Sequence, residues 1–248
     1  VNSENVVHVE IFFDPQGHLS RGVSFKTQIT GIYNALQDAQ QKWGMTSKLI
    51  MSFLRHLSEE SAFETLEEAE PYLEWIHAVG LDSSEVGHPP EKFKNVFKRC
   101  QDLGLKITAH AGEEGPPEYV WQAIDLIQVD RIDHGNRALE DINLIAKVKE
   151  KQLTLTVCPL SNLKLCVVED LSDHPIKHML RLGLNATVNS DDPAYFGGYM
   201  NDNYRALIKD SGIDKASLYQ LAHNGITGSW MDMDQKAHHI ATLNKLFA

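Results

Sequence analysis

The residues best suited to chemistry lie in the stretch 105–115, LKITAHAGEEG. A short apolar run predicts a strand that ends at His110, and Gly112 then lets the chain turn so that Glu113 faces the same cavity. An imidazole and a carboxyl group placed in this way are suited to metal-assisted hydrolysis. Taken alone, the pair has a simpler explanation, since one histidine followed by an acidic loop does not make a metal site.

Three later strand-like segments end in a similar way. Each taken singly has a structural explanation: a satisfied core histidine, a buried inert thiol, and a solvated turn before a proline. Together they favour an active site, because the carboxyl ends of parallel strands meet at one face of a barrel. The residues at these ends are His134, then Cys158 with Ser161 and Asn162, and then Asp191 with Asp192.

The pattern of apolar residues predicts the elements that must position these groups. Strand-like segments alternate with segments whose apolar residues recur at helical spacing. Single short crossovers between successive strands imply a parallel sheet, so we expect an α/β fold, a TIM (β/α)8 barrel in one domain spanning residues 1–248. The predicted strands cover residues 6–13, 48–55, 79–84, 105–110, 131–135, 153–159 and 185–191.

Composition narrows the function classes. The 248 residues carry a net charge of −11, which argues against a nucleic-acid partner and against an anionic membrane surface. The sequence holds three cysteines and no C-x-x-C pair, which fits a reduced, cytoplasmic protein. Its apolar stretches are too short to span a membrane. Oligomeric state is not readable from this pattern.

Four spaced motifs resemble one known family. HAGEE (110–114), RIDHG (131–135), TVCPLSN (156–162) and NSDDPAYFG (189–197) together look like the adenosine/adenine deaminase branch of the metal-dependent amidohydrolases. FLRHLSEE (53–60) and GLDSSEVGHPPEKF (80–93) resemble the adenine deaminase subgroup most closely. The likeness extends over nearly the whole chain and implies a zinc-dependent hydrolase of purine salvage.

The resemblance also implies roles for individual residues. His110 and Asp191 would be ligands of one Zn²⁺ ion, and Glu113 would protonate the purine ring nitrogen beside the reacting carbon. His134 would orient and help to activate the zinc-bound water, and Asp192 would hydrogen-bond the purine. The implied substrate is a small-molecule purine, and adenine would be converted to hypoxanthine and ammonia.

The sequence departs from the family at one point. Members take two further zinc ligands from a His-x-His on the first barrel strand, and this chain contains no His-x-His. We therefore expect the first strand to be missing from an N-terminally incomplete chain, which agrees with seven predicted strands in place of eight. His8, on the segment that resembles the second strand, is interpreted as structural. Two remaining ligands would hold zinc weakly, so inactivity of this chain by itself is also an expected outcome.

Three other functions stay open at this point. Adenosine deamination would differ in the room that the pocket leaves for ribose. An amidohydrolase acting on another amine or amide would keep the metal chemistry. A metal-free purine-binding protein would explain the missing ligand pair, although such a protein has no evident need for an acid beside a water-activating histidine.

Overall fold

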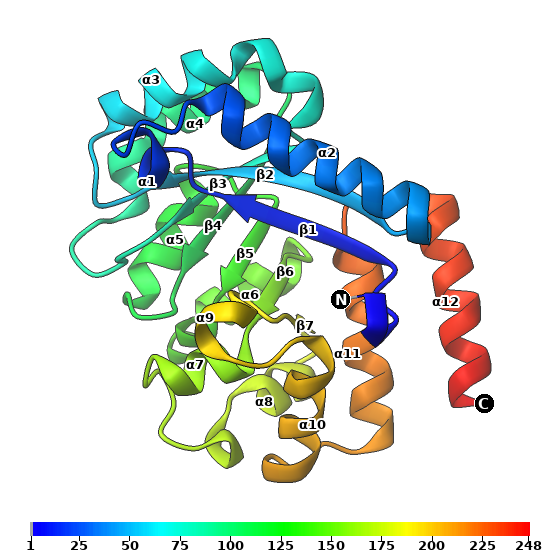
Figure 1. Cartoon of the computed structure of the whole chain (residues 1–248). Helices are drawn as coiled ribbons and strands as arrows, with labels where there is room; N and C mark the ends of the chain where they lie inside the picture. The colour runs from blue at the N-terminus through cyan, green and yellow to red at the C-terminus, as the bar shows by residue number, and fades with distance from the viewer. Residues whose placement is uncertain (1) are drawn as a thin grey trace. The chain divides into compact units, whose positions relative to one another are not determined.

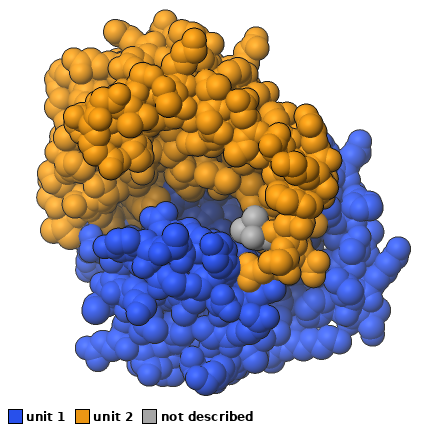
Figure 2. Space-filling view, viewed as in Figure 1, with its two compact units in different colours: residues 1, 112–117, 131–248 blue, residues 2–111, 118–130 orange. Residues whose placement is uncertain are grey.

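The computed structural model describes residues 2–248; Val1 lies outside the described residues. The chain forms two compact units, which Figure 2 distinguishes by colour. One contains residues 2–111 and 118–130, here called the N-terminal unit, and the other contains residues 112–117 and 131–248, here called the C-terminal unit. The prediction of a single domain over residues 1–248 is not tested by this division and stays a prediction.

The N-terminal unit is built on parallel strands that pair in chain order. Phe13 of β1 lies opposite Met51 of β2, Leu54 of β2 opposite Asp82 of β3, and Val79 of β3 opposite Ile107 of β4. All five residues of β3 are buried, as expected for a parallel strand covered on both faces. The strands are β1 (His8–Phe13), β2 (Thr46–Leu54), β3 (Ala78–Asp82) and β4 (Lys106–Ala111).

Helices connect these strands, and their ends follow local sequence rules. In α2, the Ser24 hydroxyl accepts a hydrogen bond from Thr27 N at 3.2 Å, and Gly44 ends the helix with φ +69°. Figure 1 shows α2 running along the strands that precede and follow it. The helices are η1 (Asn2–Glu4), α1 (Gln16–Leu19), α2 (Phe25–Trp43), α3 (Glu59–Ala69), η2 (Glu70–Trp75), η3 (Pro90–Phe93), α4 (Lys94–Asp102) and α5 (Pro117–Asp125).

The C-terminal unit repeats the same plan. Strands β5 (Arg131–His134), β6 (Thr154–Val157) and β7 (Asn185–Val188) are parallel, with Asp133 opposite Thr156 and Val157 opposite Val188. The helices are η4 (Asn136–Glu140), α6 (Ile142–Glu150), α7 (Pro159–Lys164), η5 (Leu171–Asp173), α8 (Ile176–Arg181), α9 (Pro193–Phe196), α10 (Met200–Asp210), α11 (Lys215–Gly228) and α12 (Met233–Phe247).

Helix α11 packs closely against the strands of this unit. Asn224 donates a hydrogen bond from Nδ2 to the carbonyl of Ala186 in β7 at 2.9 Å. A Cβ at Gly228 would lie 2.5 Å from Thr154 Oγ1 in β6, so only glycine allows the observed approach. Among the described residues, no helix combines the length and the apolar character needed to cross a bilayer.

The predicted strands all form, with ends shifted by a few residues. The structure adds short helices that apolar spacing does not reveal, among them α1 in the segment after β1 and α7 directly after β6. His8, predicted to be structural, hydrogen-bonds Thr46 Oγ1 through Nδ1 at 2.7 Å and contacts Glu10 Oε1 through Nε2 at 3.2 Å. Those contacts agree with the structural interpretation.

Candidate active site

The backbone of the C-terminal unit turns sharply at two predicted site residues. His134 has φ +63° at the end of β5, and Asp191 has φ +54° after β7. Residues other than glycine rarely adopt this left-handed backbone conformation, and such backbone strain concentrates at functional sites. Gly135 follows His134 with φ +73°, and a Cβ there would lie 2.9 Å from Leu155 Cδ2. The turn therefore requires a glycine at position 135.

Glu113 is carried to His134 by the loop of residues 112–117. Arg137 holds this loop, since its backbone N–H donates to the carbonyl of Gly112 at 2.8 Å and its Nη1 donates to the carbonyl of Glu114 at 3.0 Å. Glu113 Oε1 consequently lies 3.2 Å from His134 Nδ1, and the two side chains are only 11% and 2% exposed. The predicted acid and the predicted water-activating histidine are thus in direct contact.

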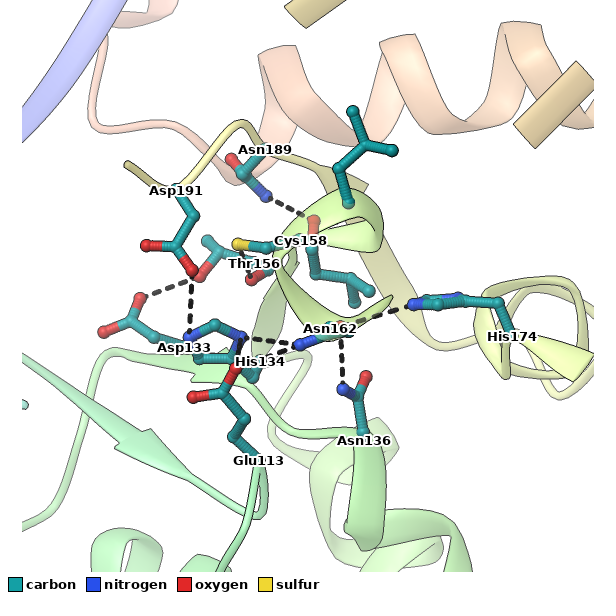
Figure 3. Close-up of polar contacts among 12 residues, drawn as sticks. Glu113, Asp133, His134, Asn136, Thr156, Cys158, Asn162, His174, Asn189 and Asp191 are labelled. Atoms are coloured by element: carbon teal, nitrogen blue, oxygen red, sulfur yellow. Dashed lines mark hydrogen bonds and ion pairs between the residues drawn. The ribbon is translucent and has the colours of Figure 1, made fainter. Parts of the chain in front are cut away.

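Asp191 lies at the other nitrogen of the same imidazole. Its Oδ2 is 3.9 Å from His134 Nε2, and its side chain is 18% exposed. Figure 3 shows Glu113 and Asp191 at opposite ends of the His134 ring. A buried imidazole with a carboxyl group at each nitrogen can accept, hold and pass on a proton, which is the requirement for general acid–base catalysis.

Cys158 completes a group whose atoms are suited to a metal ion. The donor atoms of His134, Cys158 and Asp191 all lie within 4.8 Å of one another. Nitrogen, sulfur and carboxylate oxygen are the zinc ligands found in proteins, so His134 and Asp191 offer donor types that zinc accepts, whereas sulfur binds the metal only as a thiolate. Burial, with the nearby carboxylates of Asp191 and Glu113, raises the pKa of the Cys158 thiol well above its ordinary value. The thiol also lies 3.4 Å from the carbonyl of Thr156, to which it donates, as expected of the predicted inert cysteine.

Several residues around the site were not singled out from the sequence. Asn162 was noted only as part of the strand-end motif, yet its amide lies between Glu113 and His134. Asp133 accepts a hydrogen bond from Thr156 Oγ1 at 2.8 Å. Asn136 and His174 contact Asn162 from the far side. The motifs RIDHG (131–135) and TVCPLSN (156–162) contain Asp133 and Asn162, whereas no motif in the sequence marks Asn136 or His174.

The structure also shows the surroundings of the two other predicted site residues, His110 and Asp192, each of which is described by itself. His110 lies in β4 of the N-terminal unit, where its carbonyl accepts a hydrogen bond from Arg55 Nη1 at 2.6 Å and its ring meets Phe12 edge-on, with centroids 5.9 Å apart. Asp192, which is exposed, precedes the short helix α9. The predicted roles of both residues stay predictions, and the contact group in the C-terminal unit consists of Glu113, His134 and Asp191.

Parallel strands that carry acids and an imidazole at their carboxyl ends are typical of α/β-barrel enzymes. The family model described as adenosine deaminase matches residues 1–246, and the chain belongs to this family. The adenine deaminase of a Marinomonas species is 75% identical over 248 residues, which are 100% of this chain and 74% of that protein.

Two solved structures are similar throughout. The crystal structure of adenine deaminase from Arthrobacter aurescens has a TM-score of 0.96 and 44% sequence identity, covering 99% of this chain and 75% of that one. An amidohydrolase from Burkholderia ambifaria with bound zinc has a TM-score of 0.92 and 29% identity, covering 99% of this chain and 69% of that one. The predicted TIM-barrel class and the predicted family are confirmed; the absent first strand stays a prediction.

Proposed function

We propose that this protein hydrolyses adenine to hypoxanthine and ammonia in purine salvage. The observation that carries the proposal is the position of Glu113 and Asp191 at the two nitrogens of the buried His134. The relatives named adenine deaminase, at 75% and 44% identity, support adenine over other amines. The free cysteines Cys100, Cys158 and Cys166 support a cytoplasmic location.

A zinc ion is part of this proposal. His110 and Asp191 would be ligands from this chain, and the donor set around Asp191 supports a metal at that end of the site. The zinc-bound amidohydrolase of similar structure supports the choice of metal. When bound, zinc would supply a strong nucleophile at neutral pH by lowering the pKa of water to roughly 7.

The side chains of the chain then have separate tasks. Attack by water at the amino-bearing carbon increases electron density on the adjacent ring nitrogen, and the protonated carboxyl of Glu113 donates a proton to that nitrogen. His134 accepts the proton that the attacking water loses. Return of a proton to the amino group allows ammonia to leave and restores the aromatic ring. Asp192 would hold the purine by hydrogen bonding.

The test supplies the full-length, zinc-loaded protein with adenine and adenosine separately and measures ammonia release. We expect turnover of adenine. Turnover of adenosine alone would overturn the adenine assignment, and absence of turnover with either base or nucleoside in a zinc-containing preparation would overturn deamination altogether.

A further inference from the structure

Asn162 has a completely buried side chain within the candidate active site. It lies in α7, directly after β6, and its relative exposure is 0%. Its amide Nδ2 donates to Glu113 Oε1 at 3.0 Å and lies 3.3 Å from His134 Nδ1. Figure 3 shows the side chain between these two residues and the pair formed by Asn136 and His174. One amide therefore contacts both the proposed acid and the proposed base.

The direction of these hydrogen bonds is set by a backbone amide. The N–H of Ile176 donates to His174 Nδ1 at 3.2 Å, so that nitrogen is an acceptor. Burial lowers the pKa of His174 to about 4, and the neutral ring therefore carries its single proton on Nε2. That nitrogen lies 3.3 Å from Asn162 Oδ1, which must accept. The Nδ2 end of Asn162 consequently faces Glu113.

The remaining polar atoms of Asn162 are also bonded. Asn136 Nδ2 donates to Asn162 Oδ1 at 2.8 Å as a second donor to that oxygen. The backbone N–H of Asn162 donates to the carbonyl of Cys158 at 2.9 Å, and its own carbonyl accepts from Val167 N at 2.9 Å. A side chain held at both ends in this way has one available rotamer, which makes it a rigid support for a neighbour.

The Glu113 carboxyl group needs a hydrogen-bond partner that fixes its orientation. It follows Gly112 in a loop, and the terminal torsion of a glutamate side chain is broad. Proton transfer to a ring nitrogen requires the carboxyl within hydrogen-bond reach and correctly oriented, and a misplacement of about 1 Å can cost roughly 100-fold in rate. Because the Asn162 amide N–H already donates to Oε1 of Glu113, the proton that Glu113 transfers is more favourably held on Oε2.

We propose that Asn162 is a positioning residue for deamination, whose amide N–H fixes the Glu113 carboxyl in the orientation from which it donates its proton. The proposal rests on the proposed function. His174 and Asn136 act one step further away, because they hold the Asn162 oxygen and so aim its amide at Glu113.

The test compares Asn162→Ala with Asn224→Ala in the full-length, zinc-loaded protein supplied with adenine. Asn224 is a matched control, since it is also buried and its side chain also bonds at both ends, to Ala186 and Gln220, in a helix that packs on β7. We expect Asn162→Ala to lower kcat about 10- to 100-fold with little change in KM or zinc content. Asn224→Ala should lose thermal stability and keep kcat.

A second variant, Asn162→Asp, tests the proposal in case Asn162→Ala does not fold. Asn162→Asp keeps the size of the side chain and the oxygen that Asn136 and His174 bond, and it replaces only the donor that faces Glu113. Because the new carboxylate would repel the carboxyl of Glu113, we expect at pH 8 a wild-type circular dichroism spectrum, a lower free energy of unfolding and a lowered kcat. A wild-type kcat in Asn162→Ala or in Asn162→Asp, or an equal loss in Asn224→Ala, would overturn the proposal.

A double-mutant cycle with Glu113→Gln tests the role of Asn162 separately from the role of Glu113 in the proposed function. If Asn162 acts through the Glu113 carboxyl, Asn162→Ala causes no further loss of kcat in the Glu113→Gln background. A second cycle, measured on urea unfolding, needs no turnover and uses Glu113→Ala, because glutamine would still accept the hydrogen bond from Asn162. Coupling of the two residues is expected, and additivity overturns the contact. Wild-type turnover in Glu113→Gln would overturn the role of Glu113 in the proposed function. An inactive Glu113→Gln with a normal Asn162→Ala would overturn only the role of Asn162.

Discussion

Glu113 Oε1 and His134 Nδ1 lie 3.2 Å apart, although the two residues are 21 positions apart in the chain. The loop that carries Glu113 is bonded to Arg137, and His134 is held in a left-handed turn, so neither backbone is free to drift away from the contact. A carboxyl group and an imidazole in such proximity can exchange a proton without intervening water. This contact is the basis of the first prediction.

Replacing Glu113 by glutamine should remove turnover and little else. The amide keeps the size of the side chain and cannot donate a carboxyl proton, so we expect kcat for adenine to fall roughly 100-fold or more. Circular dichroism and zinc content should match the wild type. Near-normal ammonia release from Glu113→Gln would refute the acid role.

Replacing His134 by asparagine should slow the reaction while metal is retained. Asparagine tolerates the left-handed backbone at φ +63°, so this variant removes the imidazole with less strain than alanine would introduce. We expect a loss of kcat of about 100-fold or more, because the variant removes the imidazole that contacts Glu113. Zinc analysis beside steady-state kinetics checks this, and loss of the metal in His134→Asn would make His134 a ligand.

Asp191 is predicted to bind the metal, so replacing its carboxylate should lower the zinc content of the protein. Asp191→Asn suits the left-handed φ of +54° and removes the charge of the carboxylate. Because a metal site needs its anionic ligands deprotonated, we expect zinc stoichiometry to fall well below that of the wild type. Inductively coupled plasma analysis of dialysed protein measures it. Full zinc occupancy in Asp191→Asn is the result that would rule out the ligand role.

His174 should make the fold sensitive to acid. The unfolded chain binds a proton at His174 below about pH 6.5, whereas the folded chain does so only near pH 4, because burial lowers the pKa of this histidine to about 4. Stability contributed by the neutral ring is therefore complete above pH 6.5 and decreases as the pH falls from 6.5 to 4, by up to about 3 kcal/mol. Urea unfolding at pH 7 and pH 4.5 measures the decrease.

His174→Gln should show a smaller decrease than the wild type over that interval. His178→Gln, at an exposed position of α8, is the control for removal of an imidazole from the same segment. An equal acid sensitivity in the wild type and in His174→Gln would show that the titration of His174 is not its source.

A pair of glycines in α11 tests how the helix is packed. A Cβ at Gly228 would meet Thr154 Oγ1 at 2.5 Å, whereas a Cβ at Gly225 meets nothing within 4 Å. We expect Gly228→Ala to destabilise the protein by about 1–3 kcal/mol through overpacking. Gly225→Ala should be neutral or stabilising by up to about 1 kcal/mol, because alanine favours the helix. Thermal and urea unfolding of both variants compare the two sites.

The sequence by itself determined the strands, most of the helices and the family. Apolar residues alternate or recur at spacings that only strands or amphipathic helices satisfy. The site motifs follow directly, because each strand ends where its apolar run ends. His110, Glu113, His134 and Asp191 could therefore be named as candidates before any coordinates.

Only the tertiary structure decided which side chains touch. Asn162 lies 49 residues from Glu113 and 28 from His134 along the chain, and His174 lies 12 residues beyond Asn162. Periodicity assigns a residue to a face of a strand or helix, but a hydrogen bond of 3 Å depends on strand register, loop course and rotamer together. Those are set by packing across the unit, which is why the support behind Glu113 is visible in the fold and not in the sequence.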